Sequence, residues 1–446
     1  MGDAHHQPGP AAADAVRPTF LHSERALARY LARPVARFLA VEAAGGVLLL
    51  VATVVALVWA NSPWRASYTS VFTTEIAVRI GGFGLGGDLT RWIDDGLMSV
   101  FFLVVGLEIK REVVAGELRD RRTAALPAVA AAGGMVVPAL VYAAVNAGTV
   151  AGRGWGIPIA TDIAFAAGVL AVLGRRVPRE LKVFLLALAI VDDIGAIVVI
   201  ALFYGGELQV AWLAGAAAVV GLVVVLRRLH VAPVVPYVGL GLALWLALRE
   251  GGVHPTLAGV AMGLLAPATP FQPPEVTDAI VDRLEGRPEL NAREVHGVWS
   301  VIRGSVPLTE RLEDLLHPWT SYVVVPVFAL ANAGVPLTGA AVSGAPRVAA
   351  GVALGLVAGK AVGIAGTSWL AVRLGVGRLP PAVRWAHLVG AALLGGIGFT
   401  VSLFVAGLAF DGAAAPTAAA KVGILGGSLA AAVAGSTVLL VAARRR

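Results

Sequence analysis

Long apolar blocks recur along the chain and constrain its fold more than any other feature of the sequence. Each block runs for about 17 to 25 residues, the length of helix that crosses a bilayer core. Lipid offers no hydrogen-bond partner to a free N–H or C=O, so blocks of this kind must be helical. Charged residues make up only 14% of the chain and its mean hydropathy is +0.81, whereas soluble domains carry about 25% charged residues. The sequence therefore predicts an all-α polytopic membrane protein.

Gly, Pro and charged residues divide the apolar sequence into about 12 candidate spans. These cover residues 38–60, 92–109, 124–147, 157–174, 181–204, 208–226, 231–248, 253–267, 319–337, 348–371, 385–410 and 418–442. If the N-terminus lies in the cytoplasm, most of the 35 lysines and arginines fall in inside segments. The positive-inside rule favours this assignment, which places both termini in the cytoplasm.

The net charge of +7 follows from these short arginine-bearing loops, so we assign it to topology and expect no nucleic-acid partner. The chain contains no cysteine, which excludes disulfides, thiolate chemistry and sulfur-based zinc sites.

Three regions are predicted to lie outside the membrane. We expect residues 1–37 to form a cytoplasmic N-terminal tail ahead of a transmembrane domain at 38–443, and residues 268–318 to form a cytoplasmic loop. Residues 71–91 alternate apolar and polar positions and contain Gly81-Gly82 and Gly86-Gly87, which predict the turns of a small periplasmic β-hairpin. The hairpin is either an ordinary surface feature or an edge that pairs with a second copy to form a homodimer.

Four charged residues fall near the middle of predicted spans: Asp162, Asp192, Asp193 and Lys360. A charge at the bilayer centre costs about 2.5–3.5 kcal/mol on insertion scales, so each of them requires an explanation. One explanation is a buried ion pair that locks two helices together. A single lysine cannot neutralise three aspartates, however, so a pair does not account for the whole set.

The adjacent aspartates suggest ion transport. Neighbouring residues of a helix diverge by about 100°, so Asp192 and Asp193 face different surroundings and one can pair with Lys360. Hard cations prefer oxygen ligands, and a buried carboxylate can hold either a cation or a proton. We therefore expect Na+ at Asp193 and Asp192, in competition with protons, which is the minimal form of antiport.

Two of the predicted spans contain helix breakers near mid-depth. One has Pro158 shortly before Thr161 and Asp162, and the other has glycines within LLGGIGFTVSLF. Each lies in the middle of a three-span unit, at spans 3–5 and 10–12, and an odd unit length inverts one copy. Inverted repeats whose discontinuous helices cross at the midplane are typical of secondary transporters. Taken alone, the glycines also suit ordinary close packing of helices.

Together these features resemble the NhaA family of sodium/proton antiporters. The resemblance extends from about Phe38 to the last span. It is carried by WIDDGLMSVFFLVVGLEIKREVVAGEL, GWGIPIATDIAFAAGVL, LALAIVDDIGAIVVIALFY, GGVHPTLAGVAMGLLAP, RLEDLLHPW, FALANAGV, GLVAGKAVGI and LLGGIGFTVSLFVAGLAF.

The resemblance implies a pH-activated, electrogenic Na+(Li+)/H+ antiporter of a bacterial cell (inner) membrane, without a cofactor and without enzymatic activity. It implies that Asp193 is the essential cation ligand and that Asp192 is its partner, linked to Lys360. It further implies that Asp162, with Thr161, offsets the facing dipoles of broken helices, and that Asp95 is an accessory group. The residues implied in the pH response are Glu108, Lys110, Arg111, Glu112, His254, Glu313 and His317.

Some positions depart from the family pattern or support another interpretation. The tail and much of 268–308 exceed the short forms of the family, and Asp314 stands where a second histidine can occur, which leaves the pH set-point open. His254, taken alone beside Gly-Val and Pro, also suits a structural role.

Two other functions compete with antiport. A sodium-coupled symporter would need a substrate-sized polar pocket, and the spans offer few groups for one beyond Thr161, Thr400 and Ser402. An intramembrane aspartyl protease needs a Gly-x-Gly-Asp element, but Asp88 lies in the outer loop and Leu85 replaces the first glycine.

Overall fold

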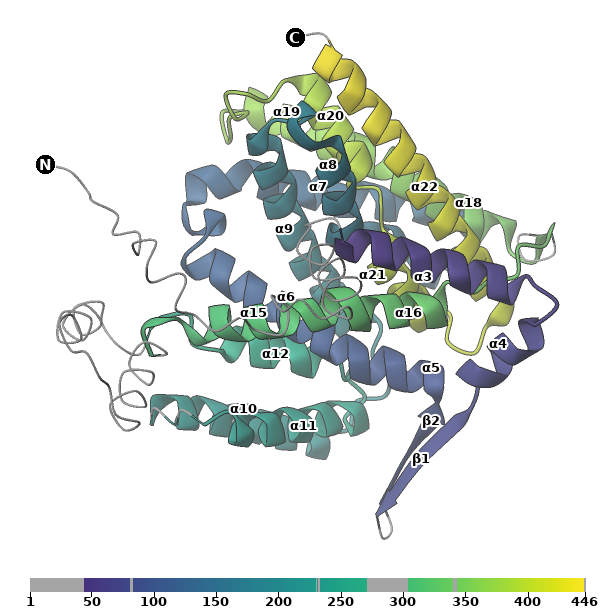
Figure 1. The fold of residues 1–446 in the computed structure, drawn as a ribbon, viewed down its shortest axis with the longest axis vertical. Coiled ribbons are helices and arrows are strands. Elements are labelled where there is room, and N and C mark those ends of the chain that lie inside the picture. The colour runs from purple at the N-terminus through teal and green to yellow at the C-terminus, as the bar shows by residue number, and fades with distance from the viewer. Residues whose placement is uncertain are drawn as a thin grey trace, which may run out of the picture.

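A computed structural model describes residues 44–80, 83–229, 231, 233–270, 304–339 and 343–444. The predicted tail 1–37, the start of the first span and most of the predicted loop 268–318 lie outside these ranges. The described chain is mostly helical with two short strands, as the apolar blocks predict (Figure 1).

The helices of the first half of the chain are α3 (Ala44–Ala60), α4 (Arg65–Phe72), α5 (Leu89–Trp92), α6 (Met98–Val114), α7 (Arg121–Val145), α8 (Ile163–Leu173), α9 (Arg179–Phe203), α10 (Val210–Arg228), α11 (Val235–Glu250) and α12 (Leu257–Leu265). Those of the second half are α15 (Leu308–Trp319), α16 (Val325–Asn332), α18 (Pro346–Leu354), α19 (Lys360–Arg373), α20 (Trp385–Leu394), α21 (Phe399–Ala409) and α22 (Ala414–Arg444). Tighter 3-10 turns are η4 (Glu117–Arg119), η5 (Val150–Ile159) and η6 (Gly174–Arg176), and wider π turns are η3 (Ile93–Leu97), η7 (Thr320–Val324) and η8 (Gly355–Gly359).

Five helices of the described chain are long and apolar enough to cross a bilayer. They are Thr123–Val145, Arg179–Phe203, Val210–Arg228, Pro346–Arg373 and Ala414–Arg444. Three bent helix pairs raise the number to as many as eight if each pair counts as one span. The multi-pass character predicted from the sequence is therefore present, while the count of about 12 spans stays a prediction.

The helix that contains most of the predicted span 319–337 begins and ends elsewhere in the chain, while the span itself stays a prediction. The helix begins at Leu308, inside the predicted cytoplasmic loop, and runs through α15, η7 and α16 to Asn332. Its first three turns mix apolar and charged residues at helical spacing, so a search for long apolar stretches misses them. Gly334 and Pro336 follow the end of the helix, where such residues commonly stop one.

The predicted hairpin is present as β1 (Glu75–Ile80) and β2 (Phe83–Asp88), paired antiparallel with Glu75 opposite Asp88. One detail of the prediction was wrong: Gly86 and Gly87 do not form a turn but lie within β2, opposite β1 residues. A strand tolerates glycine, which weakens pairing without preventing it. The hairpin projects from the rest of the molecule in Figure 1. Its pairing with a second copy stays a prediction.

The helices pack in two groups. In one, α6 packs against α12, α10 against α11, and α3 against α16. In the other, α7 packs against η5, α9 and α19, α8 packs against α9 and α22, and α22 packs against α18, α20 and α21. Contacts of α3 with α8, α6 with α9 and α16 with α21 join the groups. The second group contains both predicted helix breaks and all four mid-span charges.

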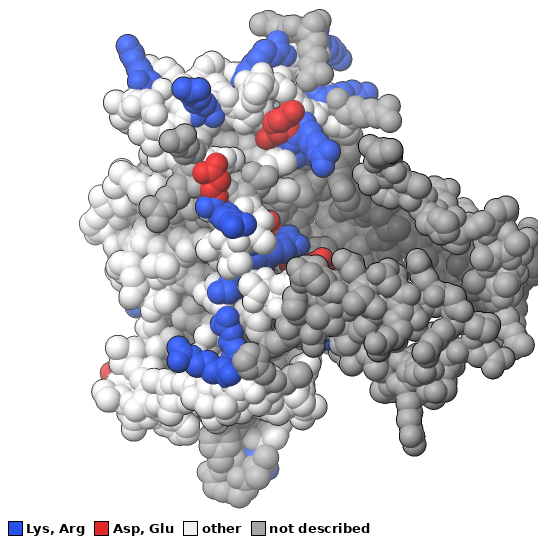
Figure 2. Space-filling model, turned by 90° about the vertical axis from the view of Figure 1, so that its left-hand side faces the viewer, with Lys and Arg blue, Asp and Glu red and all other residues white. Residues whose placement is uncertain are grey.

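One face of the molecule is rich in positive charge. Figure 2 views the side that lies at the left of Figure 1, and the Lys and Arg of the described chain on this face far outnumber its Asp and Glu. Such a bias is what the positive-inside rule predicts for the side facing the cytoplasm.

Candidate functional site

Both predicted helix breaks exist, and they meet. Residues 160–162 separate η5 from α8 with a bend of 41°, and residues 395–398 separate α20 from α21 with a bend of 45°. The amide of Asp162 donates a 2.6 Å hydrogen bond to the carbonyl oxygen of Ile397. The hydroxyl of Ser402 donates to the carbonyl of Ile157 at 2.7 Å. Some of the backbone groups freed by each break are therefore bonded by residues of the other, and backbone at membrane depth requires such partners.

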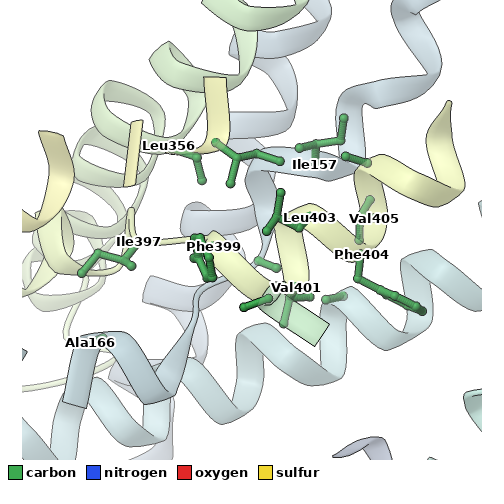
Figure 3. Packing of buried hydrophobic residues seen from close by; sticks show 14 of the residues in the cluster. Ile157, Ala166, Leu356, Ile397, Phe399, Val401, Leu403, Phe404 and Val405 are labelled. Carbon is green, nitrogen blue, oxygen red and sulfur yellow. The ribbon is translucent and has the colours of Figure 1, made fainter. Parts of the chain in front are cut away.

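Apolar side chains enclose the breaks. Figure 3 shows Ile157, Leu356, Ile397 and Phe399 among the packed residues around this point, and each is at most 3% exposed. A dry surround of this kind strengthens any hydrogen bond made inside it and penalises any polar group left without one.

Asp162 caps two helices at once. Its side chain accepts a 3.0 Å hydrogen bond from the amide of Phe165 in the first turn of α8. Its other oxygen accepts from the amide of Thr400 at 3.0 Å and from the Thr400 hydroxyl at 2.6 Å, at the start of α21. A helix N-terminus carries a partial positive charge and free N–H groups, so one carboxylate neutralises both ends.

The ammonium group of Lys360 lies at the C-terminal end of a helical segment, where the partial charge is negative. Lys360 follows the π turn η8, and π turns are frequent at functional sites. Its ammonium group donates to the carbonyl of Ile159 at 2.5 Å, to the hydroxyl of Thr161 at 3.0 Å and to Asp192 Oδ2 at 2.5 Å. Ile159 ends η5, so a cation faces the negative end of that segment. All three ammonium hydrogens have partners.

Thr161 connects the two breaks to this ion pair. Its hydroxyl oxygen lies 2.6 Å from Asp192 Oδ2 and 2.8 Å from the carbonyl oxygen of Gly395, just after the end of α20. With one hydrogen, the hydroxyl donates to only one of these acceptors at a time.

The two adjacent aspartates have different surroundings, as their helical spacing predicts. Asp192 is fully buried and paired with Lys360, and its second oxygen, Oδ1, has no hydrogen-bond partner among the described residues. Asp193 is 7% exposed, and within the described ranges no hydrogen bond or salt bridge engages its carboxylate. The structure therefore holds one carboxylate of the pair in place and leaves the other available.

Asp95 and His254 form a separate group, away from the predicted pH-response residues of α6 and α15. His254 Nε2 lies 3.8 Å from Asp95 Oδ1, and Arg91 Nε lies 3.7 Å from Asp95 Oδ2. The other ring nitrogen of His254 lies 2.9 Å from the Thr256 hydroxyl.

Four of the predicted pH-response residues come together between α6 and α15. Arg111 contacts Glu313 at 2.9 Å and Glu112 at 3.8 Å, and Glu108 lies within electrostatic range of all three. Burial raises the pKa of the Glu313 carboxyl above its ordinary value, and Arg111 offsets this only in part. Lys110 also lies on α6, but no interaction in the described chain joins it to this group. His317 lies on α15 with an exposed side chain, and its carbonyl accepts a hydrogen bond from the hydroxyl of Thr320.

Two features of the interior were not identified from the sequence as site residues. Thr400 was considered only as a pocket group, although its place just after a Gly-rich break could have indicated a cap. Asp94 accepts a 2.7 Å hydrogen bond from Asn332 and lies within electrostatic range of Lys421. Lys421 lies on α22, seven residues after its first residue, Ala414.

The fold and this site define a polytopic helical membrane protein whose buried charges gather at two broken helices, as in ion-coupled transporters. A sequence model of the family Na+/H+ antiporter 1 matches residues 36–439. The chain belongs to this family, the NhaA sodium/proton antiporters. Family members transport ions rather than catalyse a chemical reaction.

Three relatives illustrate the similarity. The Na(+)/H(+) antiporter NhaA 3 of Frankia alni is 49% identical over 417 residues, which cover 93% of this chain and 90% of the relative. The Na(+)/H(+) antiporter NhaA of Rhodopirellula baltica is 48% identical over 416 residues, which cover 92% of this chain and 94% of the relative. That of Bordetella petrii is 45% identical over 442 residues, covering 95% and 93%.

Proposed function

We propose that the chain is a pH-activated, electrogenic Na+(Li+)/H+ antiporter that exports sodium in exchange for protons by alternating access. The observation that carries the proposal is the asymmetry of the adjacent aspartates. Lys360 forms a salt bridge with Asp192. Asp193 is buried beside them and has no hydrogen-bond or salt-bridge partner in the described chain. A carboxylate so placed is ready to take a cation or a proton from a water-filled path.

In the proposed cycle, Na+ binds Asp193 with Asp192 as its partner ligand. Among the described residues no three His, Asp or Glu side chains gather into a metal site. Remaining ligands for Na+ would then come from backbone carbonyls, hydroxyls or water, which suit a hard cation that must bind reversibly. Protons displace Na+ on the other side of the membrane, and more protons than sodium ions move in each cycle. Rising pH frees carboxylates and so activates transport.

The electrostatic frame supports this cycle. Asp162 neutralises two positive helix ends, and Lys360 faces a negative one. With the helix-end charges compensated locally, the net charge of the site depends on what occupies Asp193 and its neighbour. Thr161 lies within hydrogen-bond distance of both the Gly395 carbonyl and Asp192, and its hydroxyl hydrogen goes to one or the other.

The proposed architecture is a transmembrane domain at 38–443 with about 12 spans, in which inverted three-span units cross at their broken helices near the midplane. The hydrogen bond from Asp162 to Ile397 supports the crossing. We place the protein in the bacterial cell (inner) membrane with both termini cytoplasmic, which the arginine-rich face supports (Figure 2).

The proposed homodimer forms through the hairpin. Its first strand supports this by exposing Ile76 and Val78, at 39% and 47%, on a two-stranded sheet with open edges. The proposed pH response involves the group of Glu108, Glu112, Arg111 and Glu313, together with Lys110, His317 and His254. Asp95 is an accessory group next to His254.

A symporter of an organic solute fits less well. Two cavities of the described chain, of about 950 and 400 Å3, are lined by none of the residues Asp162, Asp192, Asp193 or Lys360. Neither of them therefore offers a substrate-sized pocket beside the ion site.

The test is a proton-gradient assay in everted vesicles or liposomes across pH 6.5–9, with Na+, Li+ or K+ added to dissipate a preset ΔpH. We expect Na+ and Li+ responses that rise with pH, and none from Asp193→Asn even though it folds. Asp314→Asn, on the exposed side of α15, is the matched control and should retain activity. Absence of cation-dependent proton movement in the wild type at every pH would overturn the function. Full activity of Asp193→Asn would overturn the site assignment alone.

A further inference from the structure

One large cavity of the described chain lies away from the transport residues. Its volume is about 950 Å3, and it opens between the first turns of α7 and α9 and the segment 375–381 that leads from α19 toward α20. None of the mid-span charges lines it, and the proposed function gives it no role.

The lining of this cavity has two parts. Arg179 and Arg378, both with exposed side chains, supply two positive charges, and Glu180 supplies the one negative charge. Leu126 and Phe184 supply apolar walls, and these two residues are at most 4% exposed. The ligand that matches such a lining is anionic at one end and apolar at the other.

The start of α9 reinforces the positive end. Its first two residues line the cavity. Pro178 precedes α9 and makes no side-chain cap to it, so backbone N–H groups of that first turn are left for a ligand or water. The partial positive charge of this helix start adds to that of the arginines. The start of α7 also lines the cavity, but Asp120 already accepts hydrogen bonds there from the Thr123 hydroxyl and the Ala124 amide.

We propose that this cavity is a binding site for an anionic phospholipid, with its phosphate between Arg179 and Arg378 and the start of an acyl chain against Val183 and Phe184. Bidentate guanidinium–phosphate contacts favour arginine for this purpose. A free inorganic anion would bind the two arginines but leave the apolar wall uncovered, whereas a lipid would contact both. The cavity also lies at the ends of spans on the side where the sequence places positive charge, which is where headgroups meet a protein.

The site is coupled to α9, the helix that carries Asp192 and Asp193. Phe184 and Leu126 belong to a packed cluster with Leu188 and Ile364, which lie between the cavity and the level of Lys360. A lipid bound against Phe184 would therefore stabilise the packing of α7, α9 and α19 without touching the ion site.

The test uses the full-length protein in a neutral detergent and measures its unfolding temperature, so it does not depend on transport. Phosphatidylglycerol should raise the midpoint by about 3 °C near saturation, whereas phosphatidylcholine and inorganic phosphate at equal concentration should not. The double variant Arg179→Gln with Arg378→Gln should lose the shift. Arg373→Gln is the control, because Arg373 packs over Trp369 at the end of α19 and does not line the cavity.

A second variant tests the apolar wall with the charges intact. Val183 is 37% exposed and lines the cavity, so Val183→Trp fills the space without disturbing a buried position, and it should abolish the phosphatidylglycerol shift. An equal shift with phosphatidylcholine, or a full shift in either lining variant, would overturn the proposal. A shift of the same size with inorganic phosphate would overturn it in favour of a simple anion site.

Discussion

Asp162 accepts two hydrogen bonds from Thr400, a residue 238 positions further along the chain. With these bonds the carboxylate that starts α8 also starts α21, and the two broken helices share one cap.

Replacing Thr400 by Val removes the hydroxyl bond and keeps the shape of the side chain. A hydrogen bond to a charged group contributes about 1.5–3 kcal/mol, so we expect the free energy of unfolding to fall by about that amount. Thr367→Val is the matched control, because its hydroxyl bonds only to Gly363 in its own helix. Thermal or chemical unfolding of both variants in detergent measures the difference. Equal stabilities would show that the shared cap does not hold the breaks together.

The pair of Lys360 and Asp192 is fully buried, so removing one partner leaves an uncompensated charge. We expect Lys360→Met and Asp192→Asn each to destabilise the protein by about 3–5 kcal/mol. The double variant should lose much less unfolding free energy than the two single variants together, because it leaves neither partner of the pair as an unpaired charge. A double-mutant cycle of unfolding free energies measures the coupling. Additive losses would contradict it.

Gly363 on α19 faces α7 so closely that an added Cβ would collide with the carbonyl oxygen of Gly133. Gly366, one turn later on the same helix, has nothing within 4 Å. We expect Gly363→Ala to lower the free energy of unfolding by about 1–3 kcal/mol through overpacking. Gly366→Ala should leave the free energy of unfolding unchanged or raise it by up to about 1 kcal/mol, because alanine has the higher helix propensity. Unfolding midpoints of the two variants decide this. A neutral Gly363→Ala would show that the helices separate at little cost.

Glu313 makes a pH-dependent contribution whose sign follows from its environment. Burial raises the pKa of its carboxyl, so the folded protein binds this proton more tightly than the unfolded chain, where the pKa is about 4.5. The favourable contribution is complete below that value and is lost as pH rises through the folded pKa. The unfolding temperature of the wild type should therefore fall, relative to that of Glu313→Gln, as pH increases above about 4.5.

Thr437→Val supplies the control for this comparison, because Thr437 is an exposed, uncharged residue on another helix, α22. Its difference from the wild type should stay nearly constant across the same pH range. A constant difference for Glu313→Gln as well would contradict the assigned environment.

Features set by local patterns could be predicted from the sequence. The apolar lengths gave the class of fold, and period-two alternation gave the hairpin. The breaks followed from Pro158 and the glycines at 395–398, and the divergent surroundings of Asp192 and Asp193 followed from helical geometry. Each of these depends on residues close together in the chain, where spacing decides the structure.

Features set by partners far apart in the chain could not be predicted. The hydrogen bonds from Thr400 to Asp162 and from Asn332 to Asp94 each join positions 238 residues apart. The start of the helix at Leu308 could not be predicted for a different reason. Its first turns carry charged residues, so a search for long apolar stretches does not detect them. Glycine occurs in turns and also within strands, so the pair Gly86-Gly87 predicts a turn that the structure does not have.

The backbone bond between Asp162 and Ile397 has a mechanical consequence. Together with the shared cap, it ties the broken helices at the points where each would otherwise unravel, so displacing one half-helix drags the other with it. Lys360 and Thr161 add two further ties to the same junction. The least costly motion of this region is then a shift of the whole junction as one stiff body. In the proposed transport cycle, Asp193 on α9 would then change its exposure to either side without local unwinding of a helix.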